Sequence, residues 1–228
     1  MSAHIEKATL QFLCELAENN NRDWFTANKE RYTTAHQNII TFTDSLLAEM
    51  RKHDAIETPS AKESLMRIYR DTRFSADKTP YKTYFGGGFT RATNKLRGGY
   101  YFQISAENTF AAGGFYAPNP DDLLRIRKDI DINYPDWVKM LNSKPIANTF
   151  GALQGEKVAT APKGFSKTNP AIELLRHKQF YFMHQFTAKE VTSSSFLKEL
   201  NQTFKNLRPY FDYMSDVLTT DANGVPLV

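Results

Sequence analysis

Apolar residues at the start of the chain recur at helical spacing, and this pattern predicts two helices. The first covers residues 9–18, with Thr9 as its N-cap. The second begins at Asp23 and runs to about residue 53, because its apolar positions alternate three and four residues apart. Those positions are Phe25, Tyr32, Ala35, Ile39, Phe42, Leu46 and Met50. We therefore expect two amphipathic helices that each pack one face against a core.

In the centre of the chain the alternation changes to a period of two, which is typical of strands. Residues 65–70 and 81–90 are predicted strands, and we interpret Gly86–Gly88 in the second as a bulge or a close approach. Residues 98–105 and 110–116 predict a hairpin, because apolar and polar positions alternate on both sides of a short polar loop. The centre therefore predicts a mostly antiparallel sheet.

Helical spacing returns after this sheet and continues, with interruptions, to the end of the chain. The predicted elements are short helices at 121–130, 134–141 and 170–176, a strand at 179–186, and one or two short strands within 146–160. Phe196 to Leu218 carries a long apolar stripe, which predicts a C-terminal helix. Pro209 lies within it and is expected to kink or split that helix, because proline removes a backbone hydrogen bond.

Together these elements predict an α+β fold in which helices pack on a mostly antiparallel sheet, with long helices at both ends. No change of composition, internal repeat or low-complexity run divides the chain. We therefore expect a single domain over residues 1–228, with a loose tail at 221–228. Hydrophobic residues make up 41% of the chain, which is enough for a sizeable core.

The sequence also favours a particular compartment. Cys14 is the one cysteine, which excludes an intrachain disulfide and suits a reducing environment. It lies among apolar residues, so we expect a small buried side chain rather than a reactive thiol. The absence of a signal-peptide pattern and of a long apolar run predicts a cytoplasmic protein with no membrane partner. His177 and His184 lack acidic partners at a useful spacing, so we expect no metal site, and no cofactor is expected.

The charged residues are unevenly distributed, and the centre of the chain is strongly basic. Between Arg67 and Arg97 there are eight basic and two acidic residues, a net charge of +6, whereas the whole chain carries +4. The rest of the chain is therefore slightly acidic, at −2. A localised positive patch of this kind favours an anionic partner.

The densest part of this region, residues 67–82, combines cations, carboxylates and aromatic rings. Arginine offers a planar fork that matches phosphate or carboxylate, and lysine adds a point charge. We expect an anionic, nucleotide-like ligand here, with Tyr69, Phe74 or Tyr81 stacking on its ring. The candidate ligand-binding residues are Arg67, Arg70, Arg73, Lys78, Tyr81, Lys82, Arg125 and Arg127. Asp71 is a candidate general base.

Two alternatives stand beside this interpretation. In the first, the block is a structural salt-bridge network in a non-catalytic interaction module: Asp71 pairs with Arg73 or Arg125, and Asp77 caps the turn before Pro80. In the second, the basic patch binds nucleic acid, which requires an affinity that falls steeply with salt. The pattern leaves enzymatic activity, ligand identity and oligomeric state open.

Several motifs resemble one known family. Residues 19–25 (Asn-Asn-Asn-Arg-Asp-Trp-Phe) and residues 67–83, with their Arg-Asp-x-Arg-Phe-Ser-x-Asp-Lys-x-Pro-Tyr-Lys pattern, resemble the uncharacterised bacterial proteins of the domain of unknown function 2461 family. Residues 113–118, 125–127 and 162–165 are similar to the same pattern. The resemblance covers nearly the whole chain. It implies a single domain and supplies no mechanism.

Overall fold

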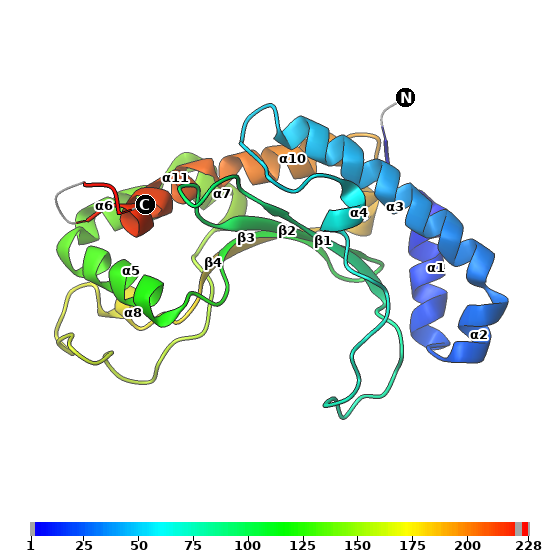
Figure 1. Cartoon of the computed structure of the whole chain (residues 1–228), viewed down its shortest axis with the longest axis horizontal. Helices are drawn as coiled ribbons and strands as arrows, with labels where there is room; N and C mark the ends of the chain where they lie inside the picture. The colour runs from blue at the N-terminus through cyan, green and yellow to red at the C-terminus, as the bar shows by residue number, and fades with distance from the viewer. Residues whose placement is uncertain (1–2, 222–224, 228) are drawn as a thin grey trace. The chain divides into compact units, whose positions relative to one another are not determined.

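A computed structural model of the chain describes residues 3–221 and 225–227 (Figure 1). Its contacts divide it into two compact units, each built from separate segments of the chain. Unit 1 comprises Met1–Phe89, Tyr101–Ala111 and Gln185–Gln202, and unit 2 comprises Thr90–Tyr100, Ala112–His184 and Thr203–Val228. The expectation of one domain over the whole chain stays a prediction.

The predicted loose tail at 221–228 falls partly on residues 222–224 and 228, which lie outside the described residues. Within the described part, Pro226 pairs with Thr220 in an isolated antiparallel bridge. The Leu227 amide also donates to the carbonyl oxygen of Thr219 at 2.7 Å.

The described residues form a four-stranded antiparallel sheet in the order β1-β2-β3-β4, which confirms the α+β fold class. The strands are β1 (Tyr84–Thr90), β2 (Gly99–Ser105), β3 (Thr109–Phe115) and β4 (Phe180–Phe186). Alternate residues of β2 and β3 are buried, as the period-two pattern predicts. Gly114 has a φ of 141°, and a Cβ there would lie 2.4 Å from the Phe180 carbonyl oxygen. The close pairing of β3 with β4 therefore requires glycine at this position.

Unit 1 holds the N-terminal helices and the start of the C-terminal one. The helices are α1 (Lys7–Glu18), α2 (Arg22–Ala27), α3 (Lys29–Met50), α4 (Ala61–Ser64), α9 (Ala188–Val191) and α10 (Phe196–Asn206), which ends in unit 2. The apolar stripe of α3 faces the core, where the rings of Phe42 and Phe196 stack with centroids 5.5 Å apart. Figure 1 shows α3 and α4 on one side of β1, with α1 beside α3.

Unit 2 holds the remaining helices. They are α5 (Pro120–Ile132), α6 (Tyr134–Leu141), α7 (Lys144–Phe150), α8 (Ile172–Leu175) and α11 (Arg208–Thr219). Trp137 is fully buried, and the Tyr210 hydroxyl donates to the Phe180 carbonyl oxygen at 2.8 Å. No helix in the described part of the chain is both long and apolar enough to cross a bilayer.

The C-terminal apolar stripe is divided as the sequence predicts. Pro209 lies in the first turn of α11, so α10 ends at Asn206 and a new helix begins. The side chains of the stripe are buried in the core, so it does not form an open partner surface.

The structure corrects three local predictions. The long N-terminal helix is broken at Asn28, whose side-chain amide donates to the Trp24 carbonyl oxygen at 2.9 Å and so competes with the helical ladder. Residues 146–150 lie in α7, for which Pro145 in the first turn suits a helix start, whereas Gln154 and Lys157, in the rest of the predicted strand region, form isolated antiparallel bridges with Tyr181 and His177. Cys14 is exposed, because it falls outside the buried stripe of α1.

Candidate anion-binding site

Residues 65–87 form a two-stranded segment, here called the ribbon, whose tip projects beyond β1 (Figure 1). Its two halves are joined by antiparallel bridges, one of which pairs Tyr69 with Tyr81. The Lys82 amide donates to the Ile68 carbonyl oxygen at 2.8 Å. The first half, predicted as a strand, is thus extended and paired, although it forms isolated bridges rather than a continuous ladder.

The base of the ribbon is fixed to the first helices. The side-chain amide of Asn20 donates to the Tyr81 carbonyl oxygen at 2.9 Å, and its Oδ1 accepts from the Tyr81 amide at 3.1 Å. The Tyr81 ring is 5% exposed and stacks on Phe25 with centroids 4.0 Å apart. Tyr81 therefore anchors the ribbon, and its ring faces Phe25 rather than solvent.

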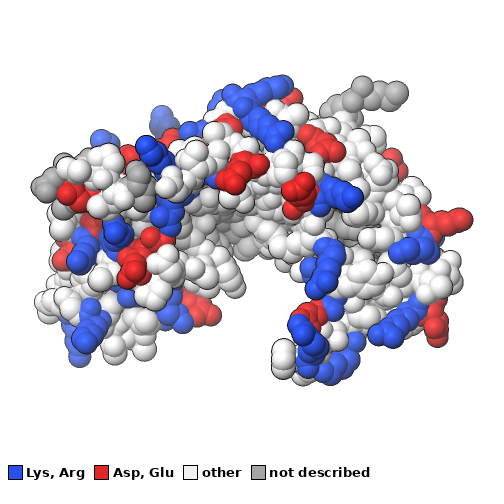
Figure 2. Space-filling view, viewed as in Figure 1, with Lys and Arg blue, Asp and Glu red and all other residues white. Residues whose placement is uncertain are grey.

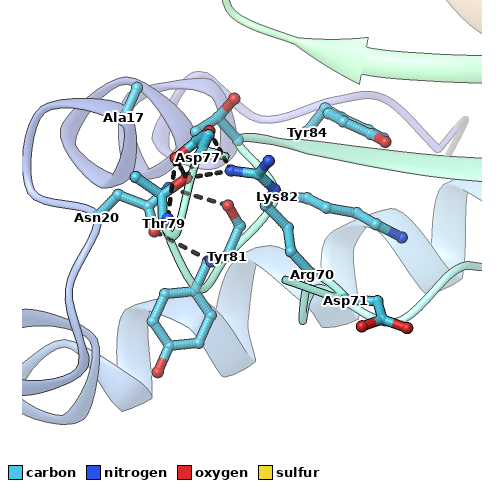
Figure 3. A pocket seen from close by; sticks show the side chains of 10 residues that line it. Ala17, Asn20, Arg70, Asp71, Asp77, Thr79, Tyr81, Lys82 and Tyr84 are labelled. Atoms are coloured by element: carbon cyan, nitrogen blue, oxygen red, sulfur yellow. Dashed lines mark hydrogen bonds and ion pairs between the residues drawn. The ribbon is translucent and has the colours of Figure 1, made fainter. Parts of the chain in front are cut away.

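Asp77 closes the loop at the tip of the ribbon (Figure 3). One of its oxygens accepts from the Thr79 amide at 2.9 Å, which is the turn cap expected before Pro80. Its other oxygen pairs with Nη1 of Arg70, and the same nitrogen donates to the Thr79 hydroxyl. The hydrogen bonds from Thr79 and Arg70 lower the pKa of Asp77 to about 2, so this carboxylate is ionised at neutral pH.

Other charged groups of the ribbon are engaged within its loop. Nε and Nη2 of Arg73 donate to the two oxygens of Asp71 at 3.0 and 2.7 Å, which is one of the pairings that the sequence proposes. The Lys78 ammonium donates to the Thr72 carbonyl oxygen at 2.9 Å. Figure 2 shows the basic side chains gathered with carboxylates at the lower right, where the ribbon ends.

A cavity of about 590 Å³ opens beside the ribbon. Its polar lining includes Asn20, Arg70, Asp71, Asp77, Lys82 and Tyr84. Figure 3 shows the Lys82 ammonium directed away from the cluster of Arg70 and Asp77. Across the described residues, no acidic side chain pairs with Lys82, and only Nη1 of Arg70 is engaged.

Arg67 is exposed and lies close to this cavity without lining it. Partial burial lowers the pKa of Lys82, and the positive charge of Arg67 lowers it further. Arg67 also has no acidic partner in the part of the chain that the structure describes. Because Asp77 pairs with Arg70 and Asp71 pairs with Arg73, neither Arg67 nor Lys82 has an ion-pair partner among the described residues, although the charge of Arg67 also contributes to lowering the pKa of Asp71.

The two remaining candidates lie on α5 in unit 2. Nε of Arg127 donates to the Leu175 carbonyl oxygen at 2.9 Å and Nη2 donates to that of His177 at 3.1 Å, so its guanidinium holds the end of α8 and the connection that leads to β4. Arg125 is exposed and lines a separate cavity of about 740 Å³. Neither residue lines the cavity beside the ribbon.

The chemistry of the cavity favours binding over proton transfer. The hydrogen bonds from Arg73 lower the pKa of Asp71, which makes this carboxylate a poor general base at neutral pH. No group of three or more His, Cys, Asp or Glu side chains within the described ranges is arranged to hold a metal ion.

Sequence reasoning does not single out Asn20, Thr79 or Tyr84, which line the cavity. Asn20 belongs to the Asn-Asn-Asn-Arg-Asp-Trp-Phe motif of the family resemblance, which was the available signal for it. Thr79 lies within the second motif, which was the available signal for it. Tyr84 lies two residues after Lys82 in the predicted strand, and this spacing, which places both side chains on one face, was the available signal for it.

The fold and the ribbon define an α+β protein with a cationic surface cavity. A family model described as "Conserved hypothetical protein (DUF2461)" matches residues 8–213. The chain therefore belongs to this family, as the motifs of the ribbon predict. No curated protein matches the chain, and no solved structure matches it.

Proposed function

We propose that this protein binds a phosphate-bearing small molecule in the cavity beside the ribbon. The observation that carries the proposal is a half-buried lysine, Lys82, which lines the cavity and has no acidic partner among the described residues. A bound phosphate would favour the charged form of Lys82 and offset its repulsion from Arg67. The cavity volume of about 590 Å³ lies within the range of small-molecule sites.

Arg70 supplies directional donors to this site. Asp77 and Thr79 hold its Nη1, which fixes the plane of the guanidinium. Its Nε and Nη2 have no partner in the described part of the chain, so they can donate to phosphate oxygens. A group that is already fixed loses little freedom on binding, which favours affinity. Arg67 adds long-range attraction.

The test is a thermal unfolding experiment with pyrophosphate at constant ionic strength. At a concentration tenfold above Kd, binding stabilises the folded protein by about 1.4 kcal/mol. For a chain of 228 residues this raises Tm by roughly 3–6 °C. Lys82→Met keeps the apolar stem and removes the charge, so we expect it to lose most of this increase.

Lys7→Met is the matched control, because Lys7 is an exposed lysine at the start of α1 that does not line the cavity. It removes the same charge and should keep the full increase in Tm. The proposal fails if pyrophosphate does not stabilise the wild-type chain. It also fails if Lys82→Met and Lys7→Met respond alike.

A further inference from the structure

The face of the sheet that turns away from α3 and α4 carries aromatic rings in unit 1. Tyr84 of β1 lines the cavity beside the ribbon. Tyr101 of β2 is its neighbour, and Phe110 of β3 follows with its ring centroid 5.7 Å from that of Tyr101. These three side chains are half-buried, whereas Phe85 and Phe102, at alternate positions, are buried. The rings therefore form a partly open aromatic surface beside the cavity.

Gly86 allows the two tyrosines to approach each other. A Cβ at this position would lie 2.7 Å from Oη of Tyr101 and 3.4 Å from Cε2 of Tyr84. Any side chain here would displace the Tyr101 ring. Burial and the neighbouring Tyr84 raise the pKa of Tyr101 to about 12, so its hydroxyl is protonated and can donate a hydrogen bond at neutral pH.

This aromatic surface lies next to Lys82. The Lys82 ammonium lies 6.0 Å from the centroid of the Tyr84 ring. The other rings of the ribbon are placed differently, since the Tyr81 ring stacks on Phe25. Phe74 is 96% exposed at the tip and does not line the cavity. Tyr81 lines the cavity, but its ring stacks on Phe25, and Tyr101 lies next to Tyr84 without lining the cavity. Tyr84, which lines the cavity beside Lys82, is therefore the ring best placed to meet a ligand.

We infer that the ligand of this cavity is a free nucleoside phosphate. Its phosphate binds Lys82 and Arg70, with long-range attraction from Arg67, and its base lies against Tyr84, next to Tyr101. This inference rests on the proposed function and adds the aromatic half of the ligand to it. Bases stack readily on tyrosine rings, and the tyrosine hydroxyl supplies a polar contact at the edge of the ring. A cavity of about 590 Å³ suits a single nucleotide.

Calorimetric titration of the full chain with three probes tests this inference. The probes are inorganic phosphate, adenosine 5′-monophosphate and adenosine. We expect adenosine 5′-monophosphate to bind about tenfold more tightly than phosphate, because stacking of one base contributes an increment of that size. Adenosine should bind more weakly than the monophosphate, because it lacks the group that Lys82 recognises.

Substitutions at Tyr84 and Tyr101 test whether their rings cause the difference in affinity between adenosine 5′-monophosphate and phosphate. Tyr84→Leu should remove the preference for the monophosphate over phosphate and keep the affinity for phosphate, whereas Tyr84→Phe keeps the ring and should keep the preference. Tyr181→Leu is the matched control, because Tyr181 is a half-buried tyrosine of β4 that does not line the cavity. If Tyr84→Leu fails to fold by circular dichroism, Tyr101→Leu takes its place.

The outcomes separate this inference from the proposed function. If phosphate and the monophosphate bind wild-type protein equally, the inference is wrong and the proposed function stands. If the preference survives in both Tyr84→Leu and Tyr101→Leu, the assignment of the base to these rings is wrong. If neither anion binds, both the inference and the proposed function fail.

Discussion

The basic segment of the sequence divides into two parts that the fold uses in different ways. In unit 2, Arg91 is fully buried, and its Nη2 donates to Asp212 at 2.9 Å. Its Nη1 donates to the Arg97 carbonyl oxygen at 3.1 Å and to the Ser215 hydroxyl at 3.2 Å. In unit 1, Lys82 is half-buried beside a cavity and has no acidic partner among the described residues.

The difference teaches how to separate structural cations from candidate binding residues. Removing a charge from water is tolerated when a partner and hydrogen bonds replace the water. For Arg91 the chain supplies these groups from α11, far along the sequence. For Lys82 the chain supplies none within its described part, although partial burial already disfavours its charge. The missing partner is therefore expected to come from outside the chain.

The largest expected effect is on stability, and it tests whether the two parts differ as described. Arg91→Ala should lower the free energy of unfolding by about 3 kcal/mol, because it opens a cavity and leaves buried polar groups without partners. Arg67→Ala should change it by less than about 0.5 kcal/mol, as for an exposed residue without packing. Urea denaturation measures both. Equal losses would show that the ribbon cations are as structural as Arg91.

The next effect is on ligand affinity, and it compares an unpaired arginine of the ribbon with a paired one. Arg67→Ala should weaken pyrophosphate binding roughly threefold, the effect of losing one solvent-screened charge. The double variant Asp71→Ala with Arg73→Ala should leave it nearly unchanged, because it removes both members of an ion pair and so keeps the net charge. Titration calorimetry at low and at physiological salt measures both affinities. The distinction is wrong if the double variant weakens binding as much as Arg67→Ala does.

A smaller effect concerns the order of the ribbon. Asp77→Ala removes the acceptor of Arg70 and Thr79, so hydrogen exchange at the Arg70 and Lys82 amides should become several-fold faster. Asp71→Ala is the control, since Asp71 binds only within the loop, and it should leave both amides unchanged. If the exchange rates of these amides are equal in the two variants, Asp77 does not close the loop as described.

The same carboxylate gives a pH dependence with a defined sign. The pKa of Asp77 is lowered from 3.8 to about 2 on folding, so its ionised form stabilises the folded ribbon. This contribution is complete above pH 4 and is lost as the pH falls from 3.8 towards 2. Carboxyl chemical shifts recorded by NMR should therefore show Asp77 titrating near pH 2 in the folded chain. A midpoint near 3.8 would contradict the bonding of the loop.

Local chemistry made much of the fold predictable from sequence. Pro209 splits the C-terminal helix as expected, because proline lacks the backbone N–H that would continue the helical hydrogen bonds of its own turn. The period-two pattern located the strands because one face of each is buried. The break at Asn28 escaped prediction, because its apolar stripe continues across the break while a side-chain hydrogen bond ends the helix.

The candidate site was predictable only where the contacting residues lie close together in the sequence. The pairing of Asp71 with Arg73 lies within three residues and was proposed in advance. The contact of Asn20 with Tyr81 spans 61 residues, and nothing in the local pattern indicates it. Arg127 was grouped with the ribbon by its charge, yet its hydrogen bonds go to carbonyl oxygens that only the fold brings near.

The smallest expected effect is the most specific test of the link between Arg67 and Lys82. Partial burial and the charge of Arg67 both lower the pKa of Lys82. Arg67→Ala should therefore raise this pKa, and the double variant Asp71→Ala with Arg73→Ala, which keeps the net charge, should leave it nearly unchanged. Pyrophosphate should raise it in the wild-type chain, because an anion stabilises the protonated ammonium. NMR titration of lysine side chains measures all three. If Arg67→Ala leaves the pKa of Lys82 unchanged, Arg67 is too remote to share a phosphate with it, and the site reduces to Lys82 and Arg70.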